Sequence, residues 1–138
     1  MKITVVGLGY VGLSNAVLLA QKNHVTAVDI DAHRVSAVNA AQSPIEDPAL
    51  SDYLANKPLN LRATTDLSSA LPDADFVVVA TPTDYDPQHN FFDTSSVDSV
   101  IRKVLAENDH ALIVIKSTIP VGYIRKMRAE FGRDRMVF

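Results

Sequence analysis

Three glycines near the N-terminus have the spacing that brings a backbone close to a phosphate group. Gly7, Gly9 and Gly12 fit the pattern G-x-G-x-x-G and directly follow a short apolar run. In this pattern the first glycine allows a tight turn, the second admits a pyrophosphate, and the third lets the next helix pack closely. Unpaired N–H groups at the start of that helix attract phosphates. The spacing predicts a dinucleotide loop, whereas without this context it indicates only a strand–turn–helix corner.

One acidic residue stands where a ribose would lie beside such a loop. Asp29 ends the second apolar run, near the expected distance of about 20 residues from the glycines. A carboxylate accepts hydrogen bonds from ribose hydroxyls and repels a 2′-phosphate, so we expect NAD in preference to NADP. The alternative for Asp29 is a cap for the helix that begins near Asp31. Arg34 stays open, since it can accommodate a 2′-phosphate, lie against adenine or face solvent.

Two threonines follow later apolar runs, at positions suited to the other half of the dinucleotide. Thr83 comes after the run 76–80, and Thr118 comes after the run 111–115. Ligands of open α/β sheets bind at the carboxyl ends of the strands, so we expect both threonines to contact the nicotinamide half. Thr118 is alternatively a helix cap before Pro120. Lys116 either balances the phosphates or only extends from a strand end.

Alternating short apolar runs and amphipathic stretches must position these residues. The helix over 95–107 has the clearest apolar stripe, and Ser95 with Asp98 has capping-box spacing. Asp66 is expected to cap a brief helix, and Pro120 to open the last helix. Residues 81–93 are expected to form a polar loop that is solvated or contacts another domain. Strands are expected over residues 3–6, 25–29, 59–63, 76–80, 111–115 and 135–138, and the other helices over 11–22, 32–41, 49–55, 66–71 and 120–131.

This alternation predicts an α/β fold of the Rossmann type, a doubly wound parallel sheet with helices on both faces. The 138 residues, of which 47% are hydrophobic and 21% charged, suit one domain over residues 1–138. A strand that ends at the last residue leads us to expect a truncated domain of a longer protein.

Composition excludes several other functions. A net charge of −3 and the lack of a basic–aromatic patch argue against nucleic-acid and membrane-surface partners. The chain has no cysteine, and its four histidines lack metal-ligand spacing. Neither a G-x-S-x-G elbow nor a phosphate loop of the Walker A type is present. No signal peptide or membrane span is recognisable, so a cytoplasmic location is expected.

Taken together, these segments resemble the UDP-glucose/GDP-mannose dehydrogenase family, and within it the UDP-glucose branch. The resemblance covers essentially the whole chain. Tyr10 and Val11 inside the glycine motif are more specific than the glycines alone. The remaining segments are Asp29, then Ala-Thr-Pro-Thr over 80–83, then Lys-Ser-Thr-Ile-Pro-Val-Gly over 116–122. The loops at 43–45 and 84–93 favour the UDP-glucose branch.

The resemblance implies an oxidation of UDP-glucose to UDP-glucuronate by two NAD⁺, through a thioester on a cysteine. Carried over, Val11, Asp29, Arg34, Thr83 and Thr118 contact NAD, and Thr118 is also associated with the chemistry by positioning a water or the reacting group. In this family the cysteine, a lysine, an acidic residue, the central helix and the UDP-sugar domain lie further along. The resemblance therefore implies a chain that binds NAD without turnover, and a full-length homodimer.

Three alternatives remain open from the sequence. The first is another nucleotide-sugar dehydrogenase, which oxidises UDP-N-acetylmannosamine or GDP-mannose. The second is a non-catalytic NAD-binding module such as a redox sensor, since fold alone does not establish chemistry. The third is a dehydrogenase of the β-hydroxyacid type, which performs one oxidation and needs no cysteine.

Overall fold

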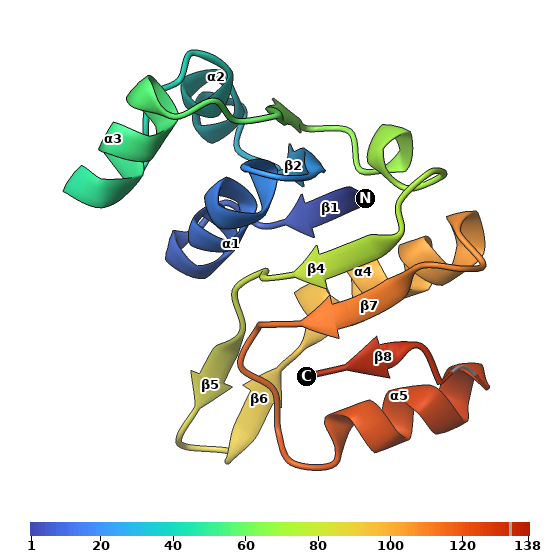
Figure 1. The fold of residues 1–138 in the computed structure, drawn as a ribbon. Coiled ribbons are helices and arrows are strands. Elements are labelled where there is room, and N and C mark those ends of the chain that lie inside the picture. The colour runs from blue at the N-terminus through green and yellow to red at the C-terminus, as the bar shows by residue number, and fades with distance from the viewer. Residues whose placement is uncertain (133) are drawn as a thin grey trace.

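Six parallel strands form the central sheet of the computed structural model, which describes residues 1–132 and 134–138 (Figure 1). From β1 the chain adds β2 and then β3 on one side of β1, and it crosses to the other side of β1 with β4. This reversal point is where a doubly wound sheet binds its ligand. The strands are β1 (Lys2–Val6), β2 (His24–Val28), β3 (Leu61–Thr64), β4 (Phe76–Val79), β7 (Leu112–Ile115) and β8 (Met136–Val137), in the spatial order β3-β2-β1-β4-β7-β8.

Helices cover both faces of the sheet, which confirms the Rossmann-type prediction. On one face, buried side chains of the first three helices cluster with Ala27 and Ala63 of the sheet. On the other face, buried side chains of the last two helices cluster with Val77 and Ile113. The first group is α1 (Tyr10–Ala20), α2 (Ala32–Asn39) and α3 (Pro48–Asn56), and the second is α4 (Ser95–Glu107) and α5 (Tyr123–Phe131).

Strand β4 shows why its sequence is an uninterrupted apolar run. Val77 and Val79 pack into the core beneath α4 and α5, whereas Val78 packs beneath α1 on the opposite face. A parallel strand buried on both faces needs apolar side chains at every position. The central position of β4 therefore follows from its composition.

The polar loop expected over residues 81–93 is instead an antiparallel hairpin, β5 (Asp84–Asp86) and β6 (Phe91–Asp93). It extends from the carboxyl edge of the sheet, away from the two layers of helices (Figure 1). The rings of Tyr85 and Phe92 lie across the pair, with centroids 4.8 Å apart. The Tyr85 hydroxyl donates to Asn90 Oδ1 at 2.5 Å. These contacts stabilise a short hairpin that its polar composition conceals.

Details expected at three helix starts are wrong, although α4 begins at Ser95 as predicted. Helix α5 begins at Tyr123, because Gly122 has a φ of +88° and ends a turn closed by Tyr123 N–H on the carbonyl of Pro120. Asp98 forms no capping box with Ser95, since Thr94 is the N-cap and Asp93 accepts the Ser95 N–H.

The helix expected after Asp66 is one 3₁₀ turn, η1 (Ser68–Ala70). It begins after Leu67 without a side-chain cap. Asp66 contributes its backbone carbonyl to the Ser69 hydroxyl, at 2.9 Å, so its carboxylate is not the cap that the sequence indicates.

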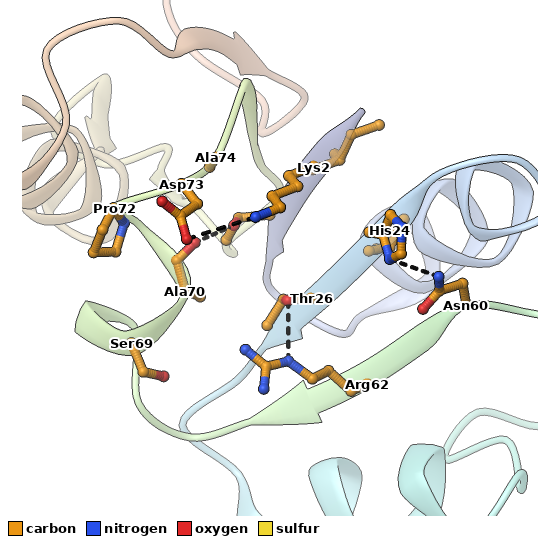
Figure 2. A pocket seen from close by; sticks show the side chains of 13 residues that line it. Lys2, His24, Thr26, Asn60, Arg62, Ser69, Ala70, Pro72, Asp73 and Ala74 are labelled. Carbon is orange, nitrogen blue, oxygen red and sulfur yellow. Dashed lines mark hydrogen bonds and ion pairs between the residues drawn. The ribbon is translucent and has the colours of Figure 1, made fainter.

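Polar side chains of β1, β2 and β3 line a hollow on one side of the sheet (Figure 2). Thr4, Thr26 and Arg62 form one cross-strand row there. Arg62 Nε donates to Thr26 Oγ1 at 3.4 Å, and Lys2 pairs with Asp73 at 3.6 Å across the hollow. The hollow has a volume of about 300 Å³ and lies toward the amino ends of the strands. It is therefore separate from the glycine loop, which follows the carboxyl end of β1.

Within the part of the chain that the structure describes, no helix has the length and apolar character needed to cross a membrane.

Candidate functional site

Gly7 and Gly12 are required by the protein's own packing at the turn between β1 and α1. Gly7 has a φ of +101°, and a Cβ there would lie 2.6 Å from the carbonyl oxygen of Ala80. A Cβ at Gly12 would lie 1.7 Å from the carbonyl oxygen of Gly7. Both contacts are far inside van der Waals distance, so only glycine permits the close approach of helix and strand. The roles predicted for these two glycines match the geometry.

Gly9 differs from the other two, because nothing in the fold requires a glycine there. Its φ is −74°, which any residue adopts, and no atom lies within 4 Å of a Cβ placed on it. The missing side chain therefore leaves open space on the outside of the loop. Such space at the start of a helix fits a bound pyrophosphate.

The N-terminus of α1 adds a positive potential to this space. Gly9 is the N-cap, no side chain caps the helix, and its first turn holds no acidic residue. The first N–H groups of a helix lack intrahelical partners and attract anions. Tyr10 and Val11 are 61% and 44% exposed at the same end. The loop thus presents N–H donors and two exposed side chains to a ligand.

Asp29 fastens the glycine loop to the end of β2. One carboxylate oxygen accepts the Leu8 N–H at 2.7 Å, and the other accepts the Asp31 N–H at 2.8 Å. The side chain is only 11% exposed. Each carboxylate oxygen has further acceptor capacity, so Asp29 is equipped to accept ribose hydroxyls while it holds the loop. The alternative of a cap for α2 is wrong, because Asp31 performs that role.

Arg34 is neutralised by two carboxylates. Its NH1 lies 3.9 Å from Asp29 Oδ2, and its Nε lies 3.8 Å from Asp31 Oδ2. The sequence left open whether Arg34 accommodates a 2′-phosphate. Two negative groups beside one positive group disfavour another dianion at this point, so the geometry favours an unphosphorylated ribose.

Thr83 and Thr118 come together on the other side of the glycine loop, because β4 and β7 are neighbours. The Thr83 hydroxyl donates to the Thr118 carbonyl at 2.7 Å. The interpretation of Thr118 as a helix cap is wrong, since α5 begins five residues later, after Gly122. Thr118 and Lys116 are both exposed at the carboxyl edge. The structure thus joins the two threonine loops into one side of the site.

Two serines that sequence reasoning missed reinforce the same side. The Ser117 hydroxyl donates to the Thr81 carbonyl, and the Ser96 hydroxyl donates to the Pro82 carbonyl, each at 2.6 Å. Isolated serines in a loop and a helix have no periodicity or spacing that marks them. Only the strand order, which brings residues 81–83, 96 and 117 together, reveals them.

The four groups are arranged in a line along the carboxyl edge of the sheet. Asp29 follows β2, the glycine loop follows β1, Thr83 follows β4 and Thr118 follows β7. Neighbouring strands are about 4.8 Å apart, so the line extends over roughly 15 Å. That length suits an extended dinucleotide, with the adenosine beside Asp29 and the other half beside Thr83 and Thr118. Among the described residues, no group of three or more His, Asp or Glu side chains is placed to hold a metal ion.

Comparisons with known proteins agree with this geometry. Residues 1–135 match the UDP-glucose/GDP-mannose dehydrogenase family, NAD binding domain. The UDP-glucose 6-dehydrogenase of Streptococcus pneumoniae is 47% identical over 138 residues, which are 100% of this chain and 35% of that protein. The enzyme of the same name from Campylobacter jejuni is 41% identical over 140 residues, which are 100% of this chain and 36% of that protein.

A solved structure of UDP-D-ManNAc dehydrogenase from Pyrococcus horikoshii has a TM-score of 0.82 and 28% identity, covering 95% of this chain and 32% of that chain. The chain thus spans about a third of the length of the curated relatives it matches.

Proposed function

Because the chain belongs to the UDP-glucose/GDP-mannose dehydrogenase family as its NAD-binding domain, we propose that it supplies the NAD site for the oxidation of UDP-glucose to UDP-glucuronate. The observation that supports UDP-glucose as the substrate is the 47% identity, over the whole chain, to a UDP-glucose 6-dehydrogenase. Residues 1–138 form one NAD-binding domain in this proposal.

The proposed cofactor contacts follow the line of groups along the sheet edge. When bound there, the nicotinamide would supply the hydride acceptor for the oxidation. The backbone of the glycine loop holds the pyrophosphate of NAD⁺, with Gly9 leaving the space and Tyr10 and Val11 flanking it. Asp29 binds the adenosine ribose, and Arg34 offsets the charge of that carboxylate. Thr83 and Thr118 orient the nicotinamide half.

Thr118 is proposed to serve the reaction as well as the cofactor. It is exposed at the carboxyl edge, and its backbone carbonyl is held by Thr83. With its backbone fixed in this way, Thr118 is suited to position a water or the reacting group of the sugar nucleotide through its exposed side chain. The sulfur nucleophile of the proposed reaction must come from outside these residues, because the chain has no cysteine. We therefore expect no NADH from the chain mixed with NAD⁺ and UDP-glucose.

NAD⁺ is expected to bind this chain at least about tenfold more tightly than NADP⁺. Asp29 and Asp31 flank the position of a 2′-phosphate, and the single charge of Arg34 is already paired with them. Isothermal titration calorimetry with each cofactor measures the difference. Raising the salt concentration is expected to narrow it, because screening weakens the repulsion. Equal or tighter binding of NADP⁺ would contradict the role of Asp29.

A chimera tests the proposed reaction. This chain replaces the matching first third of the S. pneumoniae UDP-glucose 6-dehydrogenase, and NADH is measured at 340 nm with UDP-glucose. We expect two NADH per UDP-glucose and a kcat within about tenfold of the parent enzyme. The chimera carrying Asp29→Ala is the matched control and is expected to need far more NAD⁺. A folded chimera that binds both ligands without forming NADH would refute the proposal.

A further inference from the structure

Two buried residues bracket the exposed loop that carries Thr118. Ser117 and Tyr123 are each 5% exposed, whereas Thr118, Val121 and Gly122 between them are exposed. Val121 has no neighbour that covers it, since its side chain is fully exposed. Within the loop, the partly buried Ile119 packs against the core and the Thr83 hydroxyl donates to the Thr118 carbonyl at 2.7 Å. The conformation of the loop depends on these contacts and on how its two ends are held.

Side-chain hydrogen bonds hold each end to a different part of the fold. At the first end, the Ser117 hydroxyl donates to the Thr81 carbonyl at 2.6 Å. At the second end, the Tyr123 hydroxyl donates to Asp98 Oδ1 in the first turn of α4. Gly122 is in the left-handed region with a φ of +88°, and the Tyr123 N–H donates to the Pro120 carbonyl at 3.1 Å, so the position of Tyr123 sets where the loop enters α5.

The hydrogen bond between Tyr123 and Asp98 has a phenol as its donor. Burial of the ring and the adjacent Asp98 carboxylate raise the pKa of the Tyr123 phenol well above its ordinary value. The phenol therefore stays protonated and remains a donor, and the carboxylate is acceptor-only when ionised. A hydrogen bond to a charged group contributes more than a neutral one.

We propose that Tyr123 and Asp98 are positioning residues for the NAD site, which hold the loop over 118–122 where it meets the nicotinamide half of the cofactor. They act through Thr118 and do not touch the ligand. This inference rests on the NAD site described above and adds the groups that keep one half of it in place. The adenosine half, at Asp29 and the glycine loop, follows β2 and β1 and is separated from this loop by β4, so it is expected not to depend on Tyr123 and Asp98.

That separation supplies the test, because ADP contains only the part of the cofactor that Asp29 and the glycine loop bind. In the 138-residue chain, Tyr123→Phe keeps the buried ring and removes the hydroxyl. We expect the Kd for NAD⁺ to rise about fivefold, which is the loss of one hydrogen bond, while the Kd for ADP stays unchanged. Calorimetry measures both constants, and urea unfolding measures stability.

Two further variants change Asp98, which is the acceptor of the same hydrogen bond. Asp98→Ala is expected to reproduce the selective loss of NAD⁺ affinity, and Asp98→Asn, which keeps an acceptor oxygen, is expected to restore most of it. Tyr85→Phe is the matched control, because it removes a tyrosine hydroxyl that bonds Asn90 in the hairpin. It is expected to bind both ligands as the unmodified chain does.

The outcomes separate this inference from the assignment of the cofactor. If Tyr123→Phe raises the Kd values for NAD⁺ and ADP equally, the residue is merely structural and the inference is overturned. If it raises neither, the pair does not position the loop, and the inference is again overturned while the NAD site stands. If the unmodified chain binds NAD⁺ no more tightly than ADP, the nicotinamide half adds no affinity. Both the second half of the site and this inference then fail.

Discussion

Replacing Gly12 with alanine is expected to lower the free energy of unfolding by about 3 kcal/mol or more. The new methyl carbon would lie 1.7 Å from the carbonyl oxygen of Gly7 and 3.3 Å from Cβ of Ala80. The first contact involves backbone, which has no rotamer to move aside, so α1 must shift away from the end of β1. Equilibrium unfolding in urea measures the loss, and the shift is also expected to abolish measurable NAD⁺ binding.

Gly9→Ala is the matched control, since it makes the same chemical change three residues earlier. No protein atom lies within 4 Å of the added methyl group, so the free energy of unfolding is expected to stay within about 0.5 kcal/mol of the unmodified chain. NAD⁺ binding is expected to weaken about tenfold, because the methyl group occupies the space left for the pyrophosphate. Equal destabilisation by both variants would show that the two glycines do not have separate roles.

The glycine loop and Asp29 are predictable from sequence because their geometry is local. Gly7, Gly9 and Gly12 lie within six residues, and the strand before them and the helix after them are adjacent in the chain. Asp29 is also placed by the chain itself, since β2 pairs with β1 directly after one helix. The fold follows in the same way, because each strand and helix is marked by its own apolar pattern.

The side of the site formed by the two later loops is only partly predictable. Position after a strand is enough to place Thr83 and Thr118 at the carboxyl edge. The hydrogen bonds that hold them join residues that are 14 to 36 apart in the chain. Ser96, Ser117 and Tyr123 act through the strand order and the packing of α4 beside α5, which no local pattern encodes.

Two errors, at Asp98 and at the hairpin, have different causes. Asp98 has the spacing of a capping box, but a tertiary partner, Tyr123, binds its carboxylate while Asp93 satisfies the helix start. The hairpin over 84–93 was concealed because its stability comes from one aromatic pair and from Asn90, which has a φ of +52°. At Asp98 a local rule is outweighed by a residue distant in the chain, whereas the hairpin depends on local contacts between side chains that a polar composition does not reveal.

Asp29→Ala is expected to weaken NAD⁺ binding on the order of 100-fold. A hydrogen bond to a charged group contributes about 1.5–3 kcal/mol, and tenfold in affinity corresponds to about 1.4 kcal/mol. The substitution removes the acceptor for the ribose and also leaves the Leu8 N–H of the glycine loop without its partner. The Kd for NAD⁺ by calorimetry measures the effect, and the Kd for ADP is expected to rise equally, because ADP carries the same ribose.

Asp75→Ala is the matched control for this prediction. Asp75 is also an aspartate beside a strand of the same sheet, since it directly precedes β4, and its carboxylate also accepts a backbone N–H, that of Lys2, at 2.9 Å. It lies at the amino edge, so its loss is expected to leave both Kd values unchanged.

Removing Asp29 also removes the repulsion of a 2′-phosphate and frees Arg34 from one of its two carboxylates. The ratio of the NADP⁺ and NAD⁺ Kd values should therefore fall toward one, and a ratio that stays constant while both affinities drop would mean that Asp29 orders the loop without contacting the ribose.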